Sequence, residues 1–135
     1  MLLGVKIIEF EGLGPAPFAG RMLAELGADV LVIKNAGQKE KTPKNSLLNA
    51  GKKSVFLNLK DDNDYSIALG LIKNSAAIIE GFRPGVMERL KIAPDDLKKI
   101  NKKLIYGRMT GWGQSGPRSK PVSYTHLTLP TNREV

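Results

Sequence analysis

Short apolar runs alternate along this chain with longer polar or amphipathic stretches. The runs occupy residues 5–10, 30–33, 54–59, 77–80 and 104–109, and most of them are rich in β-branched residues. Apolar runs of this length with turn-forming residues between them are typical of strands. Because helices or segments of helical length separate the five runs, the pattern predicts an α/β protein with a doubly wound, mainly parallel sheet covered on both faces.

The turn between the first two predicted strands is the most distinctive segment. It reads Gly-Leu-Gly-Pro-Ala-Pro-Phe-Ala-Gly from Gly12 to Gly20, and it leads into a predicted amphipathic helix that Gly27 is placed to end. One stripe of this helix holds Phe18, Met22, Leu23 and Leu26. The unit is therefore expected to be strand, turn, helix, strand.

A strand followed by Gly12-x-Gly14 invites comparison with the dinucleotide-binding fingerprint. That fingerprint has a third glycine where Pro17 stands, and an acidic residue where this chain has Lys34 and Asn35. The match is incomplete, so a nicotinamide cofactor is disfavoured. Two interpretations of the turn stay open: its glycines and prolines let a substrate approach the backbone, or they only make the turn tight.

Polar residues mark the remaining boundaries. Residues 35–53 are polar and rich in lysine, which predicts a mobile surface loop. Aspartates at 61–62 and 95–96 stand at predicted helix starts, where caps and dipole partners are favoured over acid–base pairs. The second of these helices is expected to run toward the lysines at 98–99, and a short helix is predicted at 86–90.

Composition narrows the class of protein. The 135 residues, 41% of them hydrophobic, suit a single domain. A net charge of +8 favours an anionic partner, although a solvated surface of lysines gives the same balance. There is no cysteine, no apolar run of roughly 18 residues and no leader pattern at the start, so we expect a cytoplasmic protein without disulfides that does not bind membranes.

Several cations stand next to the predicted strand ends, where doubly wound sheets collect their ligands. They are Lys52, Lys53, Lys60, Arg83 and Arg89. Such groups suit phosphates, whereas nucleic acid fits less well because only 6% of the residues are aromatic and none is interleaved with the cations for stacking. The one histidine, His126, has no nucleophile or metal-ligand spacing around it, so no metal site is predicted.

Six blocks, taken in order, resemble the alpha-methylacyl-CoA racemase branch of the family III CoA-transferases. They are Gly12–Phe18, Leu26–Val30, Leu57–Lys60, Glu80–Leu90, Leu104–Tyr106 and Thr110–Pro117. The resemblance implies a Rossmann-like fold, held incompletely by this chain, and an acyl-CoA thioester as substrate. It also implies an interlocked homodimer for the full-length protein, and no cofactor beyond the coenzyme A that the substrate carries.

The resemblance further implies which residues contact the substrate. The coenzyme A nucleotide is expected against Leu57, Asn58, Leu59 and Lys60, with Arg83 and Arg89 serving the same anion. The wall of the acyl site is expected at Gly14, Pro15, Pro17, Gly113 and Gln114. The chain departs from the family at two of these positions. Asn58 stands where the family commonly has aspartate, and Asn35 stands where it commonly has arginine. Lys34, next to Asn35, is the neighbouring cation.

In racemases of this kind a histidine and an aspartate remove and return an α-proton that the thioester makes acidic. The histidine would fall near Tyr124 within a Gly-His-Asp segment that this sequence lacks, and His126 is out of register. The aspartate would lie beyond residue 135, so no catalytic residue is assigned and we expect this chain to lack racemase activity. Residues 1–120 are interpreted as the amino-terminal part of the CoA-binding large domain, and residues 121–135 as a non-native tail.

Two other functions stay open. A CoA-transferase of the same family would pass coenzyme A between carboxylic acids. A non-catalytic basic module would bind a polyanion such as nucleic acid, and a salt titration would separate it from a coenzyme A site.

Overall fold

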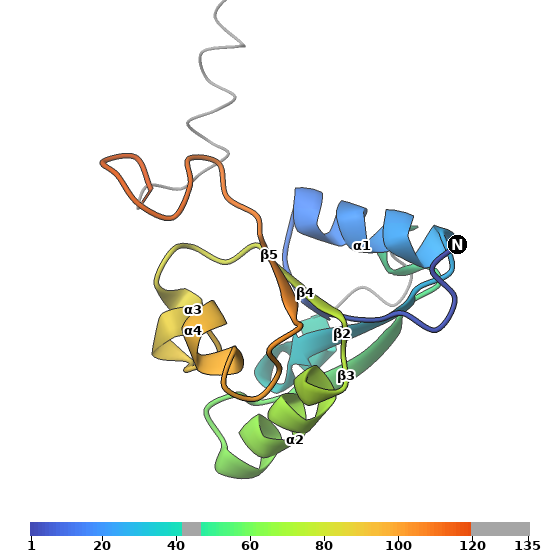
Figure 1. Ribbon diagram of the computed structural model, residues 1–135, viewed down its shortest axis with the longest axis horizontal. Coiled ribbons are helices and arrows are strands. Elements are labelled where there is room, and N and C mark those ends of the chain that lie inside the picture. The colour runs from blue at the N-terminus through green and yellow to red at the C-terminus, as the bar shows by residue number, and fades with distance from the viewer. Residues whose placement is uncertain (42–46, 120–135) are drawn as a thin grey trace, which may run out of the picture.

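The chain folds around one parallel five-stranded sheet (Figure 1). The computed structural model describes residues 1–41 and 47–119. The strands are β1 (Lys6–Phe10), β2 (Asp29–Asn35), β3 (Lys53–Leu57), β4 (Ala77–Glu80) and β5 (Ile105–Arg108). Their spatial order is β3-β2-β1-β4-β5, and every neighbouring pair is parallel, which confirms the predicted doubly wound α/β class.

Helices cover both faces of the sheet (Figure 1). On one face lies α1 (Pro15–Glu25), and on the other lie α2 (Asp62–Lys73), α3 (Val86–Arg89) and α4 (Pro94–Leu97). Two short 3-10 helices, η1 (Ala36–Lys41) and η2 (Leu47–Asn49), belong to the connection from β2 to β3. In the part of the chain that the structure describes, no helix is long and apolar enough to cross a membrane.

The two faces of the sheet hold cores of unequal size. Side chains alternate between the two faces along β1, so Ile7 packs on the α1 side and Ile8 and Phe10 pack on the other side. The larger core joins the sheet to α2, α3 and α4 and includes Ile8, Phe10, Ile33, Leu57, Ala68, Ile72, Ile78, Met87, Ile92 and Leu97. In residues 1–41 and 47–119, the buried members of the smaller core are Ile7, Ala28 and Val30. Most of the hydrophobic stabilisation therefore lies on the side opposite α1.

Helix α1 approaches the sheet through small residues. Its buried positions are Ala16, Pro17 and Gly20. Of the predicted apolar stripe, Leu23 packs on the smaller core, while Phe18, Met22 and Leu26 are 56%, 51% and 44% exposed. An apolar row thus faces away from the sheet on the outer side of α1.

Three boundaries differ from the sequence-based prediction. β3 ends at Leu57, because the Asn58 side chain accepts a hydrogen bond from the Lys60 N–H and turns the chain. α4 is a single turn that ends at Leu97, before the lysines at 98–99. The region 35–53 begins at the end of β2 and contains η1 and η2. Residues 42–46, Tyr124, His126 and the tail 121–135 lie outside the described residues.

Candidate functional site

A cavity of about 830 Å³ opens at the carboxyl ends of the strands. Its lining comes from the segment after β1, from the ends of β2 and β3, from Phe82 after β4, and from α3. β1 and β4 are neighbours in the sheet, and the connections leave them toward opposite faces, so the cavity lies at the topological switch point of the fold. Open α/β sheets bind their ligands at this place.

The cavity combines apolar walls with a cationic rim. Phe10 and Phe82 contact each other with ring centroids 6.2 Å apart, and Leu57, Leu59, Ile33, Val86 and Leu90 also line the space. The ionisable side chains of the lining are Lys34, Lys60, Arg89 and one carboxylate, Glu11. Such a surface suits a ligand that carries both apolar parts and negative charge.

The segment from Asn58 to Lys60 is held in place by the start of α2. The Asn58 N–H donates to Asp64 Oδ2 at 2.8 Å, and the Asn58 side-chain oxygen accepts from the Lys60 N–H at 3.2 Å. Asp61 caps α2 by accepting from the Asp64 N–H, which confirms its predicted role. The turn uses only the side-chain oxygen of residue 58, and an aspartate at this position would accept the same bond from the Lys60 N–H. Asparagine in place of the family's common aspartate therefore leaves the geometry of the turn unchanged.

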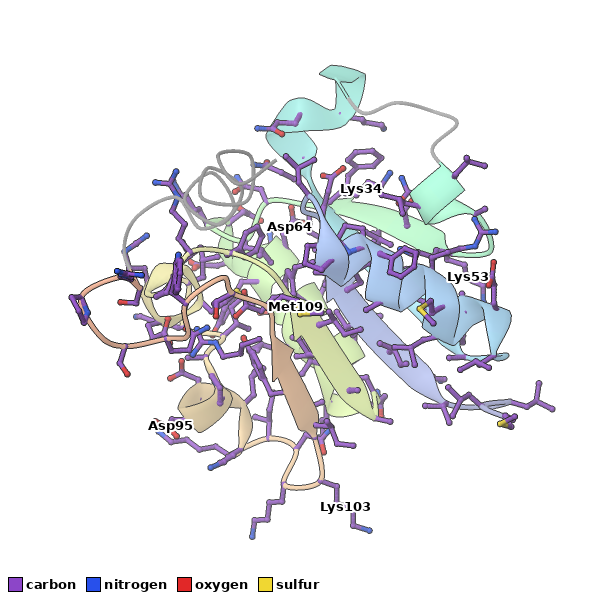
Figure 2. The ribbon with its side chains drawn as sticks, turned by 90° about the horizontal axis from the view of Figure 1, so that it is seen from above. Lys34, Lys53, Asp64, Asp95, Lys103 and Met109 are labelled. Carbon is purple, nitrogen blue, oxygen red and sulfur yellow. The ribbon has the colours of Figure 1, made fainter. Side chains whose placement is uncertain are left out.

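Lys34 is the cation at the end of β2 (Figure 2). Its side chain is buried, and its ammonium lies 5.8 Å from the centroid of the Phe56 ring. Lys39 approaches the same ring at 5.5 Å. Cation–π contact compensates part of the cost of burying Lys34 beside the cavity.

Arg108 of β5 connects the end of β4 to α3. Its Nε donates to the buried Glu80 Oε1 at 2.9 Å, and its Nη1 donates to Glu88 Oε1 of α3 at 2.6 Å. The second Glu80 oxygen accepts from the Phe82 N–H at 2.8 Å. Burial raises the pKa of Glu80, whereas the hydrogen bond from Arg108 lowers the pKa of Glu88. These bonds fix Phe82 and α3, which both line the cavity.

The cavity brings together five of the six residues expected to bind coenzyme A: Leu57, Asn58, Leu59, Lys60 and Arg89. Arg83 borders a separate hollow of about 30 Å³ beside Met109 and Thr110. The five residues expected at the acyl wall, Gly14, Pro15, Pro17, Gly113 and Gln114, do not line the large cavity, whereas Gly12 and Leu13 of the same turn do. The assignment of both residue sets to a ligand stays a prediction.

Two of the cations expected to serve an anion are engaged elsewhere. Lys52 is buried against Glu9, with its ammonium 2.7 Å from Glu9 Oε2, and Lys53 pairs with Asp29 at 3.2 Å. The prediction was wrong for Lys52, because proximity to a strand end in sequence did not reveal that the side chain turns under α1.

The sequence pattern did not single out several lining residues: Phe10, Glu11, Gln38, Phe82, Val86 and Leu90. Phe10, Glu11 and Phe82 lie at or within two residues of a strand end, so for these three the position in the pattern was a usable signal. In residues 1–41 and 47–119, no group of three or more His, Cys, Asp or Glu side chains could hold a metal ion.

The fold and the cavity define an α/β protein with a pocket at the carboxyl edge of a parallel sheet. The model of CoA-transferase family III matches residues 2–130, and the chain belongs to this family. It is 40% identical to the alpha-methylacyl-CoA racemase of Mus musculus over 92% of this chain and 32% of that protein. It is also 35% identical to the acetyl-CoA:oxalate CoA-transferase of Acetobacter aceti, over 90% of this chain and 34% of the relative.

Solved structures agree with these sequence relationships. A hypothetical protein from Mycobacterium tuberculosis matches with a TM-score of 0.81 and 35% identity, over 90% of this chain and 37% of that one. A CAIB/BAIF family protein from Brucella suis shares the fold with a TM-score of 0.84 at 23% identity, over 96% of this chain and 38% of that one. The chain spans about a third of the length of the curated relatives it matches.

Proposed function

We propose that this chain supplies the coenzyme A site of an acyl-CoA racemase, which interconverts the stereoisomers of 2-methyl-branched acyl-CoA thioesters. The observation that carries the proposal is the cavity at the switch point, with its apolar walls and its three cations, in a chain of this family. A cavity of 830 Å³ is within the size range of sites for small molecules and cofactors.

The chemistry divides between binding and proton transfer. Lys60 and Arg89 would meet phosphate groups at the rim, while Phe10, Phe82 and Leu57 would contact the less polar parts of the ligand. Proton removal and return would need two bases placed on opposite sides of the α-carbon. The expected position of the histidine base lies outside the described residues, so we assign no catalytic residue.

Calorimetric titration with coenzyme A tests the proposal. We expect saturable binding, and we expect Lys60→Ala to lower the affinity about threefold to tenfold, because it removes one charge-assisted contact. Lys73→Ala is the matched control, since this exposed lysine lies at the far end of α2 and does not line the cavity. No binding by the unchanged chain, or an equal loss in both variants, contradicts the proposal.

A CoA-transferase that passes coenzyme A between carboxylic acids is the second candidate, supported by the identity to the Acetobacter enzyme. Titration with 2-methyl-branched and unbranched thioesters separates the two functions. Tighter binding of the branched thioester supports the racemase, and tighter binding of an unbranched or dicarboxylic thioester supports the transferase.

A basic module that binds a polyanion is the alternative of another class. It requires tight binding to duplex DNA that falls steeply as salt rises, together with no saturable binding of coenzyme A. We further propose a cytoplasmic location and a homodimer for the full-length protein. The apolar row of Phe18 and Met22 on α1, with Leu26 directly after the helix, supports burial of this helix in a larger assembly.

A further inference from the structure

Three segments of the chain meet beneath α1 at one buried ion pair. Glu9 of β1 and Lys52, directly before β3, have side chains that are each only 1% exposed. The Lys52 ammonium lies 2.7 Å from Glu9 Oε2 and 3.1 Å from Oε1, and it also donates to the Pro17 carbonyl at 2.8 Å. One ammonium group therefore connects β1, the start of β3 and the first turn of α1.

Among the residues that the structure describes, the first turn of α1 has few other polar contacts. Its N-cap, Gly14, makes no side-chain capping bond, and the first turn carries no acidic residue. The Phe18 N–H reaches the Gly14 carbonyl only at 3.5 Å. On the sheet side the helix presents Ala16, Pro17 and Gly20, which bury little apolar surface. The bond from Lys52 is thus the main polar anchor of this turn.

The same turn borders the cavity. The Glu11 N–H donates to the Ile33 carbonyl at 2.9 Å, which fixes one end of the segment, and Lys52 holds the other end at Pro17. Gly12 and Leu13, which line the cavity, lie between these two fixed points. A change at Lys52 is therefore transmitted to the cavity wall through only a few residues.

We propose that Glu9 and Lys52 act as positioning residues, which set the place of the Gly12–Pro17 turn and thereby the affinity of the cavity for a coenzyme A thioester. This inference rests on the proposed function. A buried ion pair is a poor source of stability compared with apolar residues of similar volume, because removing both charges from water costs about as much as their attraction returns. What an apolar pair cannot supply is the donor to the Pro17 carbonyl.

The test replaces both charges at once. Glu9→Met with Lys52→Met keeps the volume and removes the ion pair, so we expect a melting temperature close to that of the unchanged protein. We expect about a tenfold loss of affinity for the thioester, because the turn has lost its anchor. Lys53→Met is the matched control, since its neighbouring pair with Asp29 is exposed. Unchanged affinity in a stable double variant overturns the proposal.

Hydrogen exchange of the unchanged protein provides a second measurement that does not depend on the double variant folding. Saturating thioester should slow exchange at the amides of Leu13, Gly14 and Ala16, and no change there overturns the proposal. If the unchanged chain binds no thioester, the proposed function fails. The role of Lys52 in holding the turn is then tested without ligand. The Phe18 amide should exchange faster in the double variant than in the unchanged protein, and equal exchange rates overturn the positioning role.

Discussion

Gly20 decides how closely α1 can approach the sheet. A Cβ placed on this residue would lie 2.1 Å from Glu9 Oε2 and 3.1 Å from the Lys52 ammonium. The carboxylate has little room to move, because its side chain is 1% exposed and its oxygens are held by Lys52. A hydrogen atom is therefore the largest side chain that fits at position 20 while the ion pair stays in place.

Gly20→Ala should destabilise the protein in spite of the better helix propensity of alanine. Propensity favours alanine by about 1 kcal/mol, whereas displacing the buried pair costs about 1–3 kcal/mol. The difference is a net loss of up to roughly 2 kcal/mol in the free energy of unfolding, measured with urea.

Gly70→Ala is the matched control, because a Cβ added to this glycine of α2 would have nothing within 4 Å of it. It should stabilise the protein by about 0.5–1 kcal/mol. Stabilisation of similar size by both substitutions would show that the contact with Glu9 does not restrict position 20.

At the scale of elements, Arg108 joins β4, β5 and α3 through two carboxylates in different environments. Burial raises the pKa of Glu80 above its usual value near 4.5, and the hydrogen bond from Arg108 holds the pKa of Glu88 below it. Above pH 4.5 the folded protein therefore retains more protons at Glu80 than the unfolded chain does. Below that pH, the unfolded chain binds more protons at Glu88.

The two carboxylates should give opposite dependences of stability on pH. As pH rises from 4.5, Glu80 lowers the free energy of unfolding until the pH passes its raised pKa, and Glu80→Gln should reduce this decline. As pH falls below 4.5, protonation of Glu88 removes stability, and Glu88→Gln should reduce that loss.

Urea unfolding between about pH 3 and pH 8 measures both slopes. The slopes are informative even if each substitution lowers stability at every pH. In Glu80→Gln the free energy of unfolding should still decline as pH rises above 4.5, although less steeply, because burial also raises the pKa of Glu9. Slopes that match those of the unchanged protein on both sides would contradict the assignment.

At the scale of the whole molecule, the two faces of the sheet are unequally covered. Three helices bury the larger core on one side. On the other side α1 is the one α-helix of the described residues, and Phe18 and Met22 of this helix, with Leu26 directly after it, are exposed. Exposed apolar rows of this kind promote association. The net charge of +8 opposes it, so the balance depends on ionic strength.

We expect the chain to self-associate at moderate salt, and we expect Phe18→Ser with Met22→Ser to shift it toward the monomer in sedimentation velocity. Ile67→Ser is the matched control, because Ile67 of α2 is equally exposed, at 51%, but stands outside the row. A monomeric, monodisperse unchanged chain would contradict this prediction.

The local pattern of apolar and turn-forming residues was sufficient to predict the strands and helices of the fold. Residues 77–80 form β4 as predicted, and Gly27 follows the end of α1 with φ +100°, because short apolar runs and helix-ending glycines are set by neighbouring residues. The sequence also indicated Lys60 and Arg89 at the cavity, since ligands of such sheets collect at strand ends.

Partnerships between distant residues could not be predicted in this way. In the sequence Lys52 resembled an unpaired cation, and nothing near Arg108 indicated an ion pair. The partner of Lys52 is Glu9, and the partners of Arg108 are Glu80 and Glu88; only the order of the strands brings them close. The outward row on α1 was equally hidden, since a stripe indicates one apolar face but not which neighbour covers it.

The central place of β1 has a consequence for synthesis on the ribosome. Of the five described strands β1 is made before the others. β2 can pair with it early, but the other edge of β1 stays unpaired until β4 is made, because Ile7 pairs with Ala77. The cavity is completed still later, when α3 and Leu90 have emerged. Until then the nascent chain carries an open strand edge, which is the kind of surface that chaperones protect from aggregation.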